Sequence, residues 1–151
     1  MDDGAPIPAV SVTTPDGQTI QLTDLPLPAV VYFYPKDDTS GCTREAQDFS
    51  ALAEDFAAAG ASVMGISKDS PAAHTKFIAK HGLTVNLGSD EDGSVCEAFG
   101  VWGEKKLYGK TYMGIERATF LFGADGTLVR AWRKVKVPGH AAAVLEAVRA
   151  L

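Results

Sequence analysis

The sequence predicts an α/β domain in which helices flank a mixed central sheet and a β-hairpin lies near the N-terminus. Two short β-branched and aromatic runs, Ala29–Tyr34 and Ala61–Ile66, are each followed by a segment with helix signals, which indicates parallel strands joined by helices. Two apolar runs on either side of Asp125-Gly126 indicate an antiparallel hairpin, which makes the sheet mixed. No repeat, low-complexity tract or linker is visible, so residues 1–151 are expected to form one domain.

Turn and periodicity signals define the elements of the first sixty residues. The turn sequence Pro15–Gly17 between Ser11–Thr13 and Thr19–Leu22 predicts the N-terminal hairpin. Apolar residues recur at helical spacing over Thr43–Ala59, which predicts one long helix directly after the first buried strand. Gly60 suits the position that ends this helix, because glycine readily adopts the left-handed backbone conformation found there.

The remaining elements continue the same pattern. Ser70 before Pro71 is typical of a helix start, and this helix is expected to run to about Lys80 and to stop at His81 and Gly82. A short apolar helix, the two hairpin strands and a closing helix with one apolar face follow. In order, these are Val95–Phe99, Arg117–Phe122, Thr127–Trp132 and the face made of Val144, Leu145, Val148 and Leu151. The thioredoxin-like fold has this order of elements, although periodicity alone leaves a flavodoxin-like sheet open.

Composition and charge argue against several classes of protein. Apolar residues make up 46% and charged residues 22%, as in an ordinary globular protein, and the net charge is −5. Because nucleic acids and anionic membranes attract basic surfaces, the acidic balance argues against both as partners. The apolar runs are too short to cross a membrane, and no secretory signal is visible at the N-terminus. Two cysteines do not make a disulfide framework, so a reducing cytoplasm is the expected compartment.

Cys42 is the most informative residue, because it lies where a helix is predicted to begin after a buried strand. Free N–H groups and the helix dipole favour a thiolate there, and the thiolate is the nucleophilic form of cysteine. Residue 45 is glutamate, so the second cysteine of a thioredoxin-type dithiol motif is missing. The cysteines and the three histidines show no zinc-binding spacing, so no metal site is expected. A histidine could serve as the base of a cysteine hydrolase, but none has a supporting pattern.

Pro35, Thr39 and Cys42 form the pattern Pro-x-x-x-Thr-x-x-Cys, in which the sequence resembles the peroxiredoxins and, within them, the bacterioferritin-comigratory or PrxQ subfamily. The resemblance covers nearly the whole chain and includes Tyr32–Lys36, Gly65–Ser67, Ser89–Glu91, Phe99–Lys105, Gly109–Tyr112 and Gly114–Phe120. It implies a thioredoxin-like domain of the AhpC/TSA type that reduces hydrogen peroxide and organic hydroperoxides through a cysteine sulfenic acid. It also implies no metal, haem or flavin cofactor, a thiol reductant such as thioredoxin, glutaredoxin or glutathione, and a monomer or weak homodimer.

The resemblance and the chemistry of peroxide reduction together suggest a role for each site residue. Cys42 would attack one peroxide oxygen, while Arg117, at the start of a neighbouring strand, would stabilise the thiolate and bind a peroxide oxygen. The Thr39 hydroxyl would orient thiolate and peroxide, and Pro35, which has no N–H, would shield the sulfur from water. The substrate pocket is expected to include Tyr34, Gly41 and Trp102, although both aromatic side chains also suit packing.

Simpler structural roles stay open for the residues around the nucleophile. Thr39 or Ser40 could cap the helix through its side chain. Arg44 and Glu45 could be plain surface residues of the first helical turn, where Glu45 could also close a capping contact. Ser40 stands where the subfamily usually has proline, a change that could loosen the preceding loop.

Cys96 is the one remaining candidate for a resolving cysteine, which would form a disulfide with oxidised Cys42. The positions where members of the subfamily often carry this cysteine hold Gln47 and residues 77–79, none of which is cysteine. The apolar neighbours of Cys96 in helical register instead indicate a buried core thiol. We therefore favour a one-cysteine peroxidase recycled by an external thiol. A two-cysteine enzyme that uses Cys96, and a redox sensor that signals through oxidised Cys42, remain alternatives.

Overall fold

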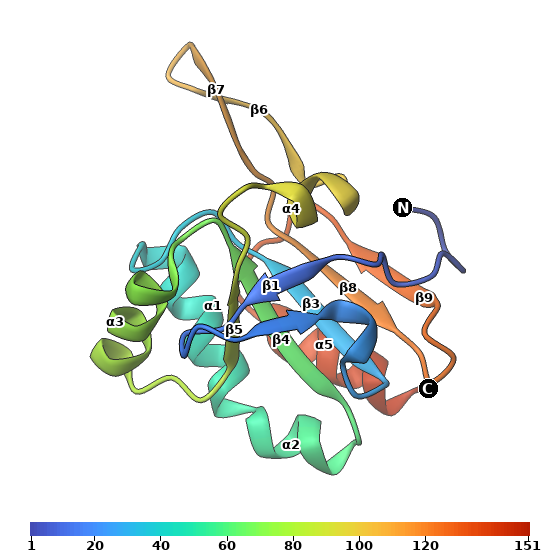
Figure 1. Ribbon diagram of the computed structural model, residues 1–151. Coiled ribbons are helices and arrows are strands. Elements are labelled where there is room, and N and C mark those ends of the chain that lie inside the picture. The colour runs from blue at the N-terminus through green and yellow to red at the C-terminus, as the bar shows by residue number, and fades with distance from the viewer.

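The computed structural model describes residues 1–151 and contains a seven-stranded sheet with the strand order β2-β1-β5-β4-β3-β8-β9 (Figure 1). The strands of this sheet are β1 (Ser11–Thr13), β2 (Thr19–Gln21), β3 (Ala29–Phe33), β4 (Ser62–Ser67), β5 (Asn86–Ser89), β8 (Ala118–Phe122) and β9 (Leu128–Trp132). Strands β3, β4 and β5 run parallel, whereas β8 and β9 at one edge and the β1–β2 hairpin at the other pair antiparallel. The sheet is therefore mixed, as predicted, and the parallel flavodoxin-like alternative is excluded.

Helices cover both faces of the sheet and enclose two hydrophobic cores. The helices are α1 (Ser40–Ala51), α2 (Ala53–Ala58), α3 (Pro71–His81), α4 (Ser94–Ala98), α5 (His140–Arg149) and a short 3-10 turn at Leu22–Asp24. Residues of α1, α2, α3 and α5 pack in one core, and residues of α4 pack in the other. Every residue of β3 is buried, as expected for a central strand covered on both faces.

The long helix expected over Thr43–Ala59 differs from the structure in its start and its continuity. Helix α1 begins three residues earlier, at Ser40, and the helical path breaks at Leu52, which separates α1 from α2. Leu52 has φ −100° and ψ 8°, outside the helical range, and its N–H is shared among carbonyls of the preceding turn. The break allows α2 to contact both β4 and α5. Gly60 follows with φ +81°, as its predicted role in ending the helix requires.

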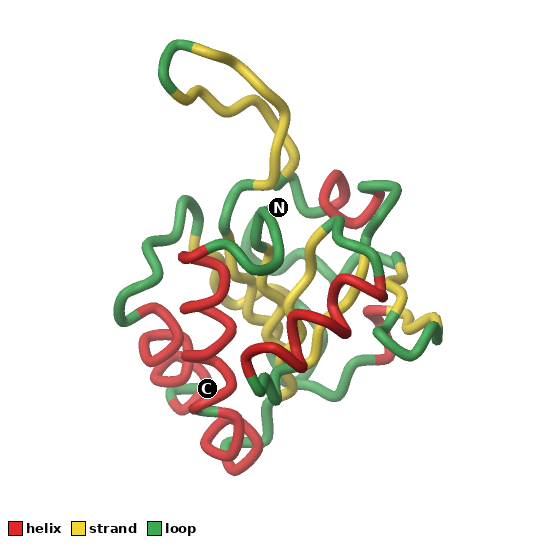
Figure 2. Tube along the Cα trace, turned by 90° about the vertical axis from the view of Figure 1, so that its left-hand side faces the viewer, coloured by secondary structure: helices red, strands yellow, loops and turns green.

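The sequence did not reveal three of the strands. Asn86 and Gly88 give β5 a low strand propensity, yet Gly88 is needed because a Cβ there would lie 2.7 Å from Val12 Cγ2. Strands β6 (Trp102–Leu107) and β7 (Lys110–Ile115) form a separate hairpin that extends away from the body of the molecule (Figure 1 and Figure 2). Several lysines obscure the alternation of apolar and polar residues that would identify its two strands. A two-residue turn with positive φ at both positions joins the strands.

The predicted helix signals on either side of the sheet are largely confirmed. The Ser70 side chain accepts a hydrogen bond from the Ala73 N–H at 3.1 Å and caps α3. In α5 the predicted apolar face is buried except for Leu151, which lies beyond the helix end and is 54% exposed. The prediction for Leu151 is wrong because the helix stops at Arg149, so the final residue no longer follows helical spacing. None of the helices has the length and apolar character that crossing a bilayer requires.

Candidate active site

Cys42 lies at the junction between the central strand β3 and helix α1. Residues 34–39 connect the two elements, Thr39 occupies the N-cap position, and Cys42 is the third residue of the helix. Cys42 is only 2% exposed, so its side chain is almost sealed from solvent. First-turn N–H groups have no partner within a helix and the dipole is positive at this end, so negative charge is stabilised at this position. The predicted placement of Cys42 in the first helical turn is confirmed.

Arg117 reaches Cys42 because strand pairing brings together two segments that are far apart in the sequence. Strand β8 runs antiparallel to β3 with Ala118 opposite Phe33, and Arg117 directly precedes Ala118. Arg117 Nη2 donates a hydrogen bond to the Cys42 sulfur at 3.3 Å. The guanidinium group thus places a fixed positive charge directly beside the sulfur. The structure thus joins the predicted nucleophile and the predicted arginine.

Glu45 completes this arrangement, although its place in the first helical turn suggests a surface position. It lies three residues after Cys42 and is only 1% exposed. Arg117 Nη1 donates to Glu45 Oε1 at 2.6 Å, so one guanidinium group bridges the sulfur and the carboxyl group. Burial raises the pKa of Glu45 to about 7, against the opposing effect of Arg117. The surface expectation is wrong for Glu45, and its three-residue spacing from Cys42 was the signal that could have revealed it.

Gly41 lies directly beside the guanidinium group of Arg117. A Cβ atom at this position would stand 3.2 Å from Arg117 Nη2, which is tighter than an ordinary contact. The absence of a side chain therefore leaves room for Arg117 to approach the first turn of α1. Gly41 thus lies beside the predicted arginine, and its expected place in the substrate pocket stays a prediction.

Thr39 and Pro35 belong to the segment that leads into α1. Thr39 is exposed, and its side chain makes no capping bond; Oγ1 instead donates to the Lys36 carbonyl at 2.9 Å. The alternative role of Thr39 as a side-chain cap is therefore not what the structure shows. Because its proton is directed at Lys36, the hydroxyl oxygen keeps lone pairs that can accept a hydrogen bond from a peroxide. Pro35 is half-buried at the start of the segment.

Tyr34 is part of the protein core. It is 1% exposed, its hydroxyl donates to Asp37 Oδ1 at 2.5 Å, and the same oxygen lies 3.4 Å from His74 Nδ1. Burial, with Tyr32 and Asp37 nearby, holds the pKa of the Tyr34 phenol far above its usual value. The expectation that Tyr34 lines the substrate pocket is wrong, because a buried polar network uses its hydroxyl.

Trp102 stands at the base of the β6–β7 hairpin. It is half-buried, Lys68 Nζ lies 4.1 Å from its ring centre, and it lines a surface hollow with Lys105 and Glu116. The hollow includes Glu116, which directly precedes Arg117 in the chain, and burial and repulsion by Arg117 lower the pKa of Lys105. Trp102 thus stays a candidate for the substrate entrance, and Lys105 is a nearby cation that no motif in the sequence marked.

Cys42 and Cys96 belong to different hydrophobic cores on opposite faces of the sheet. Val30 and Tyr32 of β3 pack in the core that contains Cys42, while the alternate residues of β3 pack in the core that contains Cys96. Successive side chains of a strand point to opposite faces, so the sheet stands between the two cysteines. Cys96 is fully buried, and burial together with Asp90 raises the pKa of its thiol well above the usual value. These are the features of an unreactive core thiol.

Comparison with known protein families identifies the relatives of this chain, because the model of the AhpC/TSA family matches residues 4–131. The chain belongs to the AhpC/TSA family. Peroxiredoxin Bcp of Xanthomonas campestris pv. campestris is 54% identical over 121 residues, which cover 80% of this chain and 76% of that relative. Peroxiredoxin Bcp of Bacillus subtilis is 45% identical over 150 residues, which cover 99% of this chain and 96% of that relative.

Solved structures show the same relationship in three dimensions. The bacterioferritin comigratory protein of Xanthomonas campestris, described for its alkyl peroxide reduction activity, matches with a TM-score of 0.90 at 45% identity, covering 99% of this chain and 98% of that chain. A mutant of PrxQ from Xylella fastidiosa matches with a TM-score of 0.92 at 40% identity, covering 99% of this chain and 96% of that chain. The chain is therefore a Bcp/PrxQ-type peroxiredoxin with a thioredoxin-like fold, and it is a thiol-dependent peroxidase, as the sequence predicts.

Proposed function

We propose that this peroxiredoxin reduces hydrogen peroxide and organic hydroperoxides at Cys42 and is recycled by an external thiol. The hydrogen bond from Arg117 to the Cys42 sulfur carries the proposal. One guanidinium group can stabilise the thiolate before the attack and the departing oxygen during it. In the same proposal Thr39 accepts a hydrogen bond from the peroxide, and Pro35 offers water no N–H beside the sulfur.

The proposed reaction is a two-electron oxidation of one sulfur. The Cys42 thiolate attacks the outer oxygen of the hydroperoxide, so an S–O bond forms while the O–O bond breaks. The electron pair of that bond leaves with the other oxygen, which takes up a proton and departs as an alcohol, or as water when the substrate is hydrogen peroxide. Cys42 is then a sulfenic acid. One external thiol displaces water to form a mixed disulfide, and a second thiol releases Cys42.

The position of the second cysteine favours one-cysteine chemistry. A disulfide needs two Cα atoms within about 7 Å of each other, with side chains that face one another. Cys42 and Cys96 pack in different cores, with the sheet between them. Cys96 is also fully buried, so an attack on oxidised Cys42 would require a large rearrangement of the fold. We therefore propose glutathione, glutaredoxin or thioredoxin as the chemical type of reductant.

Two matched cysteine variants test the proposal. Cys42→Ser should abolish peroxide turnover with a thiol reductant, whereas Cys96→Ala should retain it. The intact mass of reduced protein after one equivalent of peroxide should show one added oxygen, which dimedone captures at Cys42. A loss of two hydrogens within one chain would contradict the one-cysteine mechanism. Retained turnover in Cys42→Ser would overturn the role of this sulfur.

A further inference from the structure

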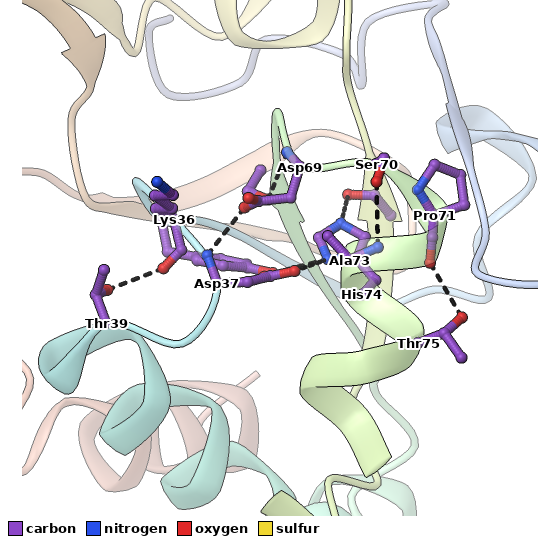
Figure 3. A network of polar contacts seen from close by, with 12 residues as sticks. Lys36, Asp37, Thr39, Asp69, Ser70, Pro71, Ala73, His74 and Thr75 are labelled. Carbon is purple, nitrogen blue, oxygen red and sulfur yellow. Dashed lines mark hydrogen bonds and ion pairs between the residues drawn. The ribbon is translucent and has the colours of Figure 1, made fainter. Parts of the chain in front are cut away.

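A buried polar network joins the segment before Cys42 to helix α3 (Figure 3). The Asp37 carboxylate lies at its centre: Oδ1 accepts a hydrogen bond from the Tyr34 hydroxyl at 2.5 Å, and Oδ2 lies 2.6 Å from His74 Nδ1. Tyr34 is 1% exposed, Asp37 9% and His74 0%. None of these polar side chains has been given a part in peroxide chemistry, so a buried network of this kind needs another explanation.

Oxygen atoms on both sides of the imidazole ring hold His74 in place beside Asp37. His74 Nε2 lies 3.2 Å from the carbonyl oxygen of Gly88 in β5, while Nδ1 faces the Asp37 carboxylate. Both ring nitrogens of His74 are therefore engaged with oxygen atoms inside the protein. Removal of either partner would leave a buried polar group without its hydrogen-bond partner, which is unfavourable.

Further contacts fasten the same segment to α3 and to the residues before it. The Asp37 N–H donates to Asp69 Oδ2 at 2.9 Å, next to the start of α3 (Figure 3). Asp38 contacts Lys80 Nζ at 2.6 Å and His81 Nε2 at 2.8 Å, at the other end of the helix. Asp38 is exposed, so these last pairs are weak compared with the buried pair at Asp37. The segment therefore has one strong and one weak attachment to α3.

The attached segment controls the position of the reacting sulfur. It contains Pro35 and Thr39 and continues without interruption into the first turn of α1, where Cys42 lies. Thr39 is held by a hydrogen bond to the Lys36 carbonyl, one residue before Asp37. The position of the Thr39 hydroxyl relative to the sulfur thus depends on where Asp37 is anchored.

The same anchor opposes the second half of the catalytic cycle. Cys42 is only 2% exposed, with Arg117 on its sulfur. A small peroxide can enter such a site, but the sulfur of a reducing thiol must make direct contact with Cys42 Sγ before a disulfide can form. The first turn of α1 must therefore move after oxidation, and the segment fastened to α3 must move with it.

We propose that the buried Asp37–His74 pair is a positioning device that holds Cys42 in the peroxide-reducing state and sets how readily the oxidised sulfur becomes accessible. The inference rests on the proposed recycling of Cys42 by an external thiol. Asp37 and His74 do not touch the reacting atoms; they act through Thr39 and the first turn of α1. Loss of the pair should therefore slow oxidation of Cys42 and speed reduction of its sulfenic acid, two effects with opposite signs.

The test separates these two half-reactions in His74→Gln, in Asp37→Asn and in the wild type. Oxidation of Cys42 by hydrogen peroxide is followed by rapid mixing, quenching with an alkylating reagent and intact mass. Reduction of the preformed sulfenic acid is followed in the same way against increasing glutathione. We expect at least about a tenfold slower oxidation in both variants, as a displaced catalytic group produces. We expect the reduction rate to reach a plateau in the wild type and a higher plateau in both variants.

His81→Gln is the matched control, because it removes a histidine–aspartate contact between the same segment and the same helix at an exposed position. Both of its half-reactions should stay within about twofold of the wild type. Circular dichroism of every variant confirms folding, and Asp37→Asn, which keeps the shape of the side chain, covers the case in which His74→Gln does not fold.

The two possible failures give different results. If both half-reactions in a folded variant are unchanged, or both slow together, the positioning role is overturned while the peroxidase proposal stands. If wild-type Cys42 is never oxidised, the proposed function itself is overturned, and the inference with it.

Discussion

Replacement of Glu45 by glutamine should make the protein relatively more stable at alkaline pH. The Glu45 carboxyl group is 1% exposed, Oε1 accepts a hydrogen bond from Arg117, and Oε2 has no partner. Burial raises its pKa from 4.5 to about 7, even though Arg117 opposes the shift. Ionisation of this carboxyl group therefore costs more in the folded chain than in the unfolded chain, whereas glutamine keeps the oxygen acceptor and never ionises.

The size and sign of the effect follow from the raised pKa. Between pH 4.5 and about 7 the folded protein binds more protons at Glu45 than the unfolded protein does, so its stability falls as the pH rises through this window. A difference of roughly 2.5 pKa units at about 1.4 kcal/mol each amounts to about 3 kcal/mol. The stabilising contribution is complete below pH 4.5 and lost above about pH 7. Relative to the wild type, Glu45→Gln should therefore gain about 3 kcal/mol between acid and alkaline pH.

Urea unfolding at about pH 4 and about pH 9 measures this difference directly, since groups other than Glu45 titrate in both proteins and largely cancel. Glu54→Gln on α2 is a suitable control because Glu54 is exposed, and its effect should stay within about 0.5 kcal/mol at both pH values. An equal effect of Glu45→Gln at both pH values would refute the reasoning. It would mean that Arg117 keeps Glu45 ionised throughout and that the attraction between them outweighs burial.

Three further substitutions test the site and the second core. Arg117→Gln removes the donor to the Cys42 sulfur and should slow single-turnover oxidation about 100-fold; a rate within twofold of the wild type would contradict its role. Gly41→Ala places a Cβ 3.2 Å from Arg117 Nη2, so oxidation should slow severalfold while thermal unfolding shows no loss of stability, because alanine favours the helix by up to about 1 kcal/mol. Cys96→Ala should lower the free energy of unfolding by about 1 to 2 kcal/mol through a small cavity, with peroxide turnover unchanged; a large loss of turnover at intact stability would instead support a resolving role.

Local signals in the sequence were enough to place the nucleophile. The continuous β-branched and aromatic run at Ala29–Tyr34 indicates a strand buried on both faces, and the structure confirms it over Ala29–Phe33. Helical spacing directly after this strand places Cys42 in the first turn of a helix. Any residue in a first turn lies beside backbone N–H groups that have no partner within the helix. Such predictions succeed because they depend on residues that are neighbours in the chain.

The errors concern elements whose structure is set by partners distant in the sequence. Strand β5 contains asparagine and glycine and forms because β4 and β1 pair with it. The β6–β7 hairpin carries several lysines and lacks an apolar face that would mark it as two strands. The helix predicted as continuous breaks at Leu52, where the chain turns to let α2 contact β4 and α5.

By itself, the sequence determined the α/β class, the position of Cys42 at a helix start and, through its resemblance to the peroxiredoxins, the residues expected around that sulfur. Only the tertiary structure decided that Arg117, 75 residues away, donates to Cys42, that Glu45 is buried beneath it, and that Cys96 lies across the sheet. The Asp37–His74 pair, 37 residues apart, also became visible only there. The physical reason is that local propensity specifies which element a residue joins, whereas burial, charge pairing and access to a sulfur depend on which elements pack against one another.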